Sequence, residues 1–244
     1  MPNHDSPDPI PRRKLSDAVF DRLHAMIRSG ELLPEDPLPS ERALMDRYGV
    51  GRPAVREALQ ALHTMGLITV SHGERSRVKR LTPQSAVHQL DGIAQTLLSV
   101  APENLDHLKD ARKMFETGLV RVATARCTAA DIDALRQMIT DQSAARDNPT
   151  AFIAADIAFH ARIIAIAGNP VVSAVADAML KWIFQHHSAL LRWSGHEDVT
   201  LTEHGQIVDA MAAGNGGDAA RLMGVHLDRS AHMTEVPANP NDVQ

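Results

Sequence analysis

Apolar residues recur every three or four positions along most of the chain, which is the spacing of amphipathic helices. The first run covers residues 15–27 and precedes Gly30, a residue type that commonly ends helices. A polar, proline-rich stretch follows at residues 31–39. Ser40 then stands at the N-cap position of a second, short helix, which Gly49 can end. The pattern predicts two helices separated by an irregular segment.

A third helix is predicted to start near Pro53 and to end at Gly66. It is joined to the second by a short connection around Val50-Gly51, which is typical of a helix-turn-helix. The period then changes, and residues 67–70 and 77–79 are typical of two short strands around a turn at 72–75. A hairpin after the third helix predicts a winged helix-turn-helix.

The rest of the chain keeps the helical period, with Thr128 and Asp131 spaced as a capping box and Gly168 placed as a helix stop. No strand-like alternation and no internal repeat occurs there. We therefore predict a mainly α protein: an N-terminal winged helix-turn-helix and a C-terminal all-helical bundle. The expected segments are a flexible arm (1–13), the winged helix-turn-helix domain (14–80), a linker (81–84), the helical domain (85–233) and a flexible tail (234–244).

Composition narrows the class of protein. With 44% hydrophobic residues, the 244-residue chain can bury a core, and 3% aromatic residues favours helix packing. The single cysteine, Cys127, excludes an internal disulfide framework and a multi-cysteine zinc site, and it fits a reducing cytoplasm. No uninterrupted apolar run approaches the roughly 18 residues of a membrane span, and the N-terminus lacks the apolar stretch of a signal peptide. We expect a soluble cytoplasmic protein.

The net charge of −5 is unevenly distributed. Residues 1–80 carry 13 Lys and Arg against 11 Asp and Glu, whereas the remainder carries 12 against 19. Within the first part, residues 51–80 hold six basic and two acidic side chains. Such an excess suits a polyanion, although a solvated charged surface explains charge alone equally well.

The positions of the basic residues in the predicted elements favour DNA as the polyanion. Arg52 and Arg56 share one face at the start of the third helix, the end that a recognition helix presents to the major groove. The arginine fork bonds O6 and N7 of guanine. Arg42 is placed to contact a phosphate. The wing tip, His72 and Gly73, could approach a minor groove, with Arg75 and Arg77 nearby to neutralise backbone charge.

Histidine is frequent, at 13 residues, and one pairing indicates metal chemistry. Asp156 and His160 are four residues apart at the apolar margin of a predicted helix, and His204 and His226 lie beside apolar residues on later helices. A divalent metal would satisfy such buried polar groups, and this donor set suits zinc, nickel or manganese. Taken alone, the Asp156–His160 pair is also compatible with a structural ion pair.

The residues of the first part carry a family resemblance. The strings Leu-Pro-Ser-Glu-Arg (38–42), Val-Gly-Arg-Pro-Ala-Val-Arg-Glu-Ala-Leu (50–59) and Met-Gly-Leu-Ile (65–68) resemble the winged helix-turn-helix of the GntR family over roughly residues 14–80. The resemblance implies operator contacts for Arg42, Arg52, Arg56, His72 and Gly73. The wing fragment 73–78 departs from the glycine-rich wing of the wider family and is similar to that of its sialic-acid-responsive repressors.

Residues 85–232 resemble, more loosely, the FCD effector domain of the FadR branch of this family, most specifically at 159–170. The resemblance implies a divalent metal held by Asp156, His160, His204 and His226, most often zinc, with octahedral positions left for water or an effector's oxygens. It also implies that Arg112 faces the cavity and clamps an effector carboxylate. An intrahelical ion pair between Arg112 and Glu116 is the alternative.

From the sequence we therefore expect a homodimeric transcriptional regulator that binds double-stranded operator DNA and acts as a repressor. A carboxylate-bearing metabolite, N-acetylneuraminate by the resemblance, would modulate operator binding at the metal site. The alternatives are a metal-responsive regulator, or a regulator of a different acid such as a uronate, lactate or glycolate. A metal-dependent enzyme is disfavoured, since no His-Glu-x-x-His string, phosphate loop or nucleophile elbow occurs.

Overall fold

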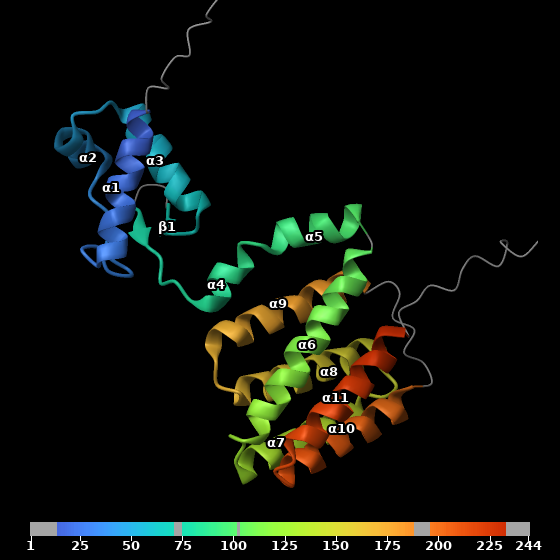
Figure 1. Cartoon of the computed structure of the whole chain (residues 1–244). Helices are drawn as coiled ribbons and strands as arrows, with labels where there is room; N and C mark the ends of the chain where they lie inside the picture. Colours follow the sequence, from blue (N-terminus) through green and yellow to red (C-terminus); the bar gives the residue numbers. More distant parts are fainter. Residues whose placement is uncertain (1–13, 71–74, 102, 188–195, 233–244) are drawn as a thin grey trace, which may run out of the picture. The chain divides into compact units, whose positions relative to one another are not determined.

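The computed structural model describes residues 14–70, 75–101, 103–187 and 196–232. These residues form eleven helices and one two-stranded hairpin, so the predicted mainly α class is confirmed. The chain divides into two compact units, Met1–Gln89 and Leu90–Gln244 (Figure 1).

The first unit is a winged helix-turn-helix with one additional helix. In chain order its elements are α1 (Leu15–Ser29), α2 (Glu41–Tyr48), α3 (Arg52–Thr64), β1 (Ile68–Thr69), β2 (Arg77–Val78) and α4 (Pro83–His88). The two strands are antiparallel, with Ile68 opposite Val78 and Thr69 opposite Arg77.

Local chemistry accounts for the helix-turn-helix. The Ser40 hydroxyl accepts a hydrogen bond from the Ala43 amide at 3.2 Å and caps α2, as the sequence predicts. Gly49 ends α2 with φ of 63°, a left-handed conformation that glycine adopts without steric cost. Three residues after Gly49, α3 begins, with Pro53 in its first turn. The tight connection thus depends on Gly49.

The core of this unit joins the three helices and the wing. It is formed by residues that are at most 3% exposed: Val19, Leu23, Leu38, Leu44, Val55, Ala58, Leu62, Ile68 and Val78. The wing is also tied to the segment before α2, because the Leu38 amide donates to the Ser76 carbonyl at 2.8 Å. Burial of side chains from α1, α2 and both strands against α3 fixes the position of α3.

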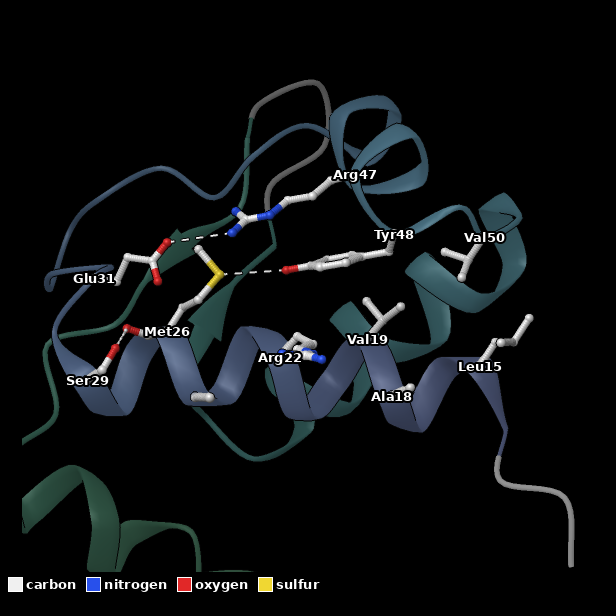
Figure 2. Close-up of a pocket in the computed structure, with 11 residues that line it drawn as sticks. Leu15, Ala18, Val19, Arg22, Met26, Ser29, Glu31, Arg47, Tyr48 and Val50 are labelled. Atoms are coloured by element: carbon white, nitrogen blue, oxygen red, sulfur yellow. Dashed lines mark hydrogen bonds and ion pairs between the residues drawn. The ribbon is translucent and has the colours of Figure 1, made fainter.

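A groove of about 690 Å³ runs along α1 and the end of α2 (Figure 2). Within it the Tyr48 hydroxyl donates to the Met26 sulfur at 3.7 Å, and Arg47 pairs with Glu31 at 3.8 Å. These contacts hold the end of α2 against α1. None of the predicted DNA-contacting residues that the structure describes lines this groove.

One helical pattern of apolar residues is divided between two helices in the structure. The sequence pattern over Val87–Leu97 is continuous, yet the structure breaks it between α4 and α5 (Asp91–Val100). Helix α4 begins at a capping box between Thr82 and Ser85, and the following Gln89 packs its side chain over Gly66 in the first unit. Helix α5 instead packs against α9 in the second unit. The helix is therefore broken where the chain passes from one unit to the other, although the periodic pattern continues.

The second unit is an all-helical bundle. After α5 its helices are α6 (Asn104–Thr124), α7 (Ala129–Ala144), α8 (Pro149–Ile166), α9 (Pro170–His187), α10 (Glu197–Ala212) and α11 (Gly216–His232). The predicted capping box of Thr128 and Asp131 is present at the start of α7. Helix α6 packs against α8, α9 and α11, which brings helices distant in sequence around one core.

Helix α8 passes close to the centre of this bundle. With 18 residues and a mean hydropathy of 1.4, this helix is long and apolar enough to cross a membrane. It nevertheless buries six residues inside the bundle, including Phe152, Phe159 and Ile163, together with the polar Asp156 and His160. A core helix of a globular bundle has this composition, and here its polar residues define the site described below.

Candidate functional site: nucleic-acid interface and metal centre

Two arginines project from the start of α3. Arg52 is its first residue and Arg56 lies one turn later, with side chains 61% and 65% exposed. Both guanidinium groups therefore reach solvent from the N-terminal end of the second helix of the helix-turn-helix. That is the end from which such a helix reads base edges.

Glu41, the first residue of α2, contacts both arginines. Its carboxylate accepts from Nε of Arg56 at 3.0 and 3.2 Å, and it lies 3.7 Å from Nε of Arg52. One carboxylate thus connects the first turns of α2 and α3. The sequence places Glu41 in a helix start but gives no indication of these contacts, which depend on the turn at Gly49.

The remaining predicted DNA contacts are distributed around this surface. Arg42 is exposed in the first turn of α2, and Arg75 is exposed before β2. Arg77 donates from Nη1 to the Glu35 carbonyl at 2.9 Å and so helps to hold the wing. His72 and Gly73, predicted at the wing tip, lie outside the described residues.

The second unit brings together the four predicted metal ligands. Asp156 and His160 come from α8, His204 from α10 and His226 from α11, and all four are at most 2% exposed. One possible ligand atom from each lies within 4.8 Å of the others. Ligand atoms about 2.0–2.2 Å from a single zinc ion lie at most about 4.4 Å apart, so a small inward movement of these side chains would let all four bind one ion.

Each histidine is oriented by an acceptor at its Nδ1 atom. His160 Nδ1 lies 2.5 Å from the Glu116 carboxylate, and His226 Nδ1 lies 2.7 Å from that of Glu203. His204 Nδ1 lies 3.0 Å from the side-chain oxygen of Gln142. Because carboxylate and amide oxygens can only accept, each Nδ1 carries the proton that it donates.

The consequence is a cluster of lone pairs. A neutral imidazole protonated at Nδ1 presents an unprotonated Nε2, and the Nε2 atoms of His160 and His226 are 3.2 Å apart. Nε2 of His204 has no hydrogen-bond partner in the described part of the chain and lies 3.4 Å from an Asp156 oxygen. Three lone pairs and the Asp156 carboxylate converge, and the Gln142 side-chain nitrogen donates to that carboxylate at 3.4 Å. This arrangement fits a cation, and this donor set fits a divalent transition metal.

The charges around the site agree with this assignment. Burial lowers the pKa of His204 well below its ordinary value, and burial also lowers the pKa of His226. Neutral imidazole, the form that binds a metal, is thereby favoured. Glu116 and Glu203 each pair with an arginine, Arg112 and Arg229. Asp156 has no arginine against it among the described residues, so its charge is available to a metal ion.

Glu116 links the metal site to Arg112. Burial would raise the pKa of Glu116, but the positive charge of Arg112 and the hydrogen bonds from His160 and Arg112 outweigh burial and hold this pKa at about 2. Arg112 donates from Nε to Glu116 at 2.5 Å and lies over the Phe184 ring, 5.8 Å from its centre. The ion pair that the spacing allows is therefore present, and it is buried rather than solvated.

Arg112 retains one donor for another partner. Its Nη2 is buried without a hydrogen-bond partner among the described residues, although the side chain is only 10% exposed. A buried, unpaired guanidinium nitrogen is costly unless something fills the role of acceptor. A carboxylate oxygen is the acceptor that arginine binds most strongly.

Three residues of the site were not predicted in their roles. Gln142 is fully buried, Glu203 precedes a ligand in sequence, and Glu116 was considered only as a partner of Arg112. The polar Gln142 within the apolar stripe of α7 was the one available signal for a buried hydrogen-bonding role. The others act across helices distant in sequence.

Comparison with known proteins identifies both units. The family described as "Bacterial regulatory proteins, gntR family" matches residues 15–78, and the FCD domain matches residues 107–229. Among similar proteins, the HTH-type transcriptional repressor NanR of Escherichia coli (strain K12) is 38% identical over 222 residues, covering 90% of this chain and 84% of that protein. NanR of Cronobacter sakazakii is 36% identical over 222 residues, covering 90% and 85%.

Solved structures share the fold. Streptococcus agalactiae GntR aligns with a TM-score of 0.68 at 20% identity, covering 89% of this chain and 99% of that one. E. coli McbR/YncC aligns with a TM-score of 0.51 at 15% identity, covering 91% and 98%. At these identities the likeness concerns the fold alone.

Proposed function

The chain belongs to the GntR family of bacterial transcriptional regulators and carries an FCD domain, and from this premise we propose how it works. It is a DNA-binding regulator and not an enzyme. In our proposal it represses transcription in the cytoplasm as a homodimer, and a small carboxylate bound at a metal site changes its affinity for the operator. The observation that carries the metal part is the convergence of three buried imidazole Nε2 atoms on the Asp156 carboxylate, each ring having an acceptor at its Nδ1.

We propose that α3 reads the operator. Arg52 and Arg56 would bond base edges in the major groove, and Arg42 would bond a phosphate. Arg75, with His72 and Gly73, would contact DNA from the wing. The exposure of Arg52 and Arg56 at the start of α3 supports these assignments.

We propose that Asp156, His160, His204 and His226 hold a divalent metal, with zinc preferred and nickel or manganese as alternatives. The bound metal would supply positive charge and open coordination positions for the oxygens of an acid. Arg112 would bind the acid's carboxylate through Nη2 while Nε stays on Glu116. Effector and metal would then share one chain of contacts, from Arg112 through Glu116 to His160.

The effector that we propose is N-acetylneuraminate, on the sequence resemblance of residues 159–170 and of the wing to sialic-acid-responsive repressors of the family. A uronate or a hydroxy acid such as lactate or glycolate is the alternative within the same chemistry. A regulator that responds to the metal itself is the second candidate, supported by the complete burial of the ligand set.

A thermal-shift comparison tests the effector. With metal-loaded protein, N-acetylneuraminate is expected to raise Tm, because a ligand that binds only the folded state stabilises it by about 2.7 kcal/mol at a hundredfold excess over Kd. Arg112→Lys keeps the charge beside Glu116 but loses the guanidinium fork, and it should weaken this shift. Arg136→Lys, an exposed pair with Asp209, is the matched control.

The outcomes separate the candidates. A shift with a uronate or lactate and none with N-acetylneuraminate would contradict the effector while preserving the site. No shift with any acid, together with operator binding that follows metal concentration, would favour the metal-responsive regulator instead.

A second prediction concerns Glu116. Glu116→Gln is expected to lower metal affinity about 10- to 100-fold, because a partner that orients a metal-binding histidine and raises its basicity is lost. The measurement is competition with a chromophoric chelator. Asp106→Asn makes the same chemical change at an exposed position of α6 and should leave metal affinity unchanged. Equal metal Kd values for a folded Glu116→Gln variant and wild type would refute the orienting role.

A further inference from the structure

We propose that Glu41 is a specificity-determining residue of the DNA interface. In this proposal its carboxylate holds the guanidinium groups of Arg52 and Arg56 in one orientation and opposes binding to DNA that offers only phosphates. The inference rests on the proposed DNA-reading role of α3 and assigns a function to an acidic residue inside a basic surface.

The first support is geometric. Both arginines face Glu41 with Nε: Arg56 at 3.0 and 3.2 Å, and Arg52 at 3.7 Å. An arginine can bond a base through its Nε edge or through its two terminal nitrogens. With Nε turned toward Glu41, the terminal nitrogens are left for O6 and N7 of a guanine. Glu41 therefore favours base contacts through the two terminal nitrogens of each guanidinium group over contacts through its Nε edge.

The second support is position. Glu41 belongs to α2 whereas the arginines belong to α3, so the contact crosses the turn that defines the helix-turn-helix. Side-chain entropy would otherwise let each exposed arginine sample many rotamers. A carboxylate that is 35% exposed and anchored in the first turn of a capped helix restricts both at once. Restriction before binding reduces the entropy lost when a base contact forms.

The third support is charge. Phosphate attraction supplies most non-specific affinity and depends on uncompensated positive charge. Glu41 places a negative charge directly between two arginines that would otherwise bind any backbone. Base contacts can offset the local repulsion in the correct sequence, whereas a sequence without them cannot. The expected result is a lower affinity for arbitrary DNA and a larger ratio of specific to non-specific binding.

A purely structural ion pair is the competing explanation. Exposed pairs contribute little to stability, about 0.2–1 kcal/mol. A structural role would therefore change Tm slightly and leave sequence preference unaltered. Sequence preference is the readout that separates the two explanations.

The experiment uses the full-length protein and a pool of random-sequence DNA duplexes, sequenced after binding. Wild type is compared with Glu41→Ala and Glu41→Gln. The matched control is Glu57→Ala, which removes the same charge from an exposed residue of α3 that pairs with Lys14 and not with either arginine. Affinity for the unselected pool is measured in parallel, and Tm verifies folding.

For Glu41→Ala we expect affinity for the unselected pool to rise about threefold to tenfold and the enriched motif to lose its preference at one or two positions in each half-site. Glu41→Gln keeps an acceptor but loses the charge, so it should bind the pool more tightly while retaining more of the motif. An enriched motif and pool affinity in Glu41→Ala equal to those of Glu57→Ala would overturn the proposal. If Arg52→Ala and Arg56→Ala each enrich the same motif as wild type, the DNA-reading role of α3 fails, and the role of Glu41 fails with it.

Discussion

Replacement of His204 by alanine is expected to abolish the stabilisation that a divalent metal gives to this protein. His204 supplies the Nε2 atom that has no hydrogen-bond partner among the described residues. Without His204, the site retains only two imidazoles and one carboxylate of its four candidate ligands. In wild type, metal at a hundredfold excess over Kd should add about 2.7 kcal/mol, which corresponds to a rise in Tm of roughly 5–10 °C.

The measurement is the difference in Tm between metal-loaded and chelator-treated samples of each variant. This difference removes the intrinsic cost of the cavity that alanine leaves beside the Phe159 ring, which stacks on His204 at 4.0 Å. His107→Ala, an exposed histidine of α6, is the control and should keep the full metal response. Zinc, nickel and manganese are compared in turn. A metal response of wild-type size in His204→Ala would exclude this ligand set.

Half of the metal site could be predicted from local spacing alone. Asp156 and His160 share a face because they lie four residues apart, and caps and periodicity placed them on one helix, α8. His204 and His226 were candidates because they lie beside apolar residues on later helices, and the family resemblance then joined them to this pair. Nothing local determines that α10 and α11 bring those two side chains against α8, since this follows from packing of the whole bundle.

The residues that accept hydrogen bonds from the ligand histidines are even harder to predict from local spacing. Glu116 lies 44 residues from His160, and Gln142 lies 62 residues from His204. The spacing of residues along the sequence does not show which histidine a carboxylate or amide contacts across such separations. The apolar pattern of residues 87–97 suggests one helix but is divided between α4 and α5 for a related reason, because its two halves belong to different units.

The DNA-binding part was predicted almost entirely, since its signals are local. Ser40 accepts a hydrogen bond from the amide of Ala43, three residues away, Gly49 ends the same helix, and the paired strand residues lie at most ten residues apart. What escaped the sequence is Glu41, whose contact with Arg56 spans 15 residues across the turn. Local chemistry thus specifies the scaffold, and long-range contacts specify how its functional side chains are held.

The second large effect is expected from the arginines of α3. Arg52→Ala should weaken binding to the selected operator by about 1–3 kcal/mol and relax one base preference, because a bidentate contact to a base edge is lost. The double variant with Arg56→Ala should lose at least as much. Its two effects need not add, since both side chains contact Glu41.

Titration of the operator at several salt concentrations checks this prediction. Arg47→Ala removes the same charge from α2, but Arg47 pairs with Glu31 in the groove of Figure 2, and this variant should bind nearly as wild type does. Arg42→Ala should differ from both: a lost phosphate contact weakens binding to all sequences alike and lowers the salt slope by about 1. If Arg52→Ala behaves as Arg47→Ala does, α3 does not read the operator through Arg52. If it instead weakens all sequences equally, Arg52 contacts the backbone and the bases are read by other residues.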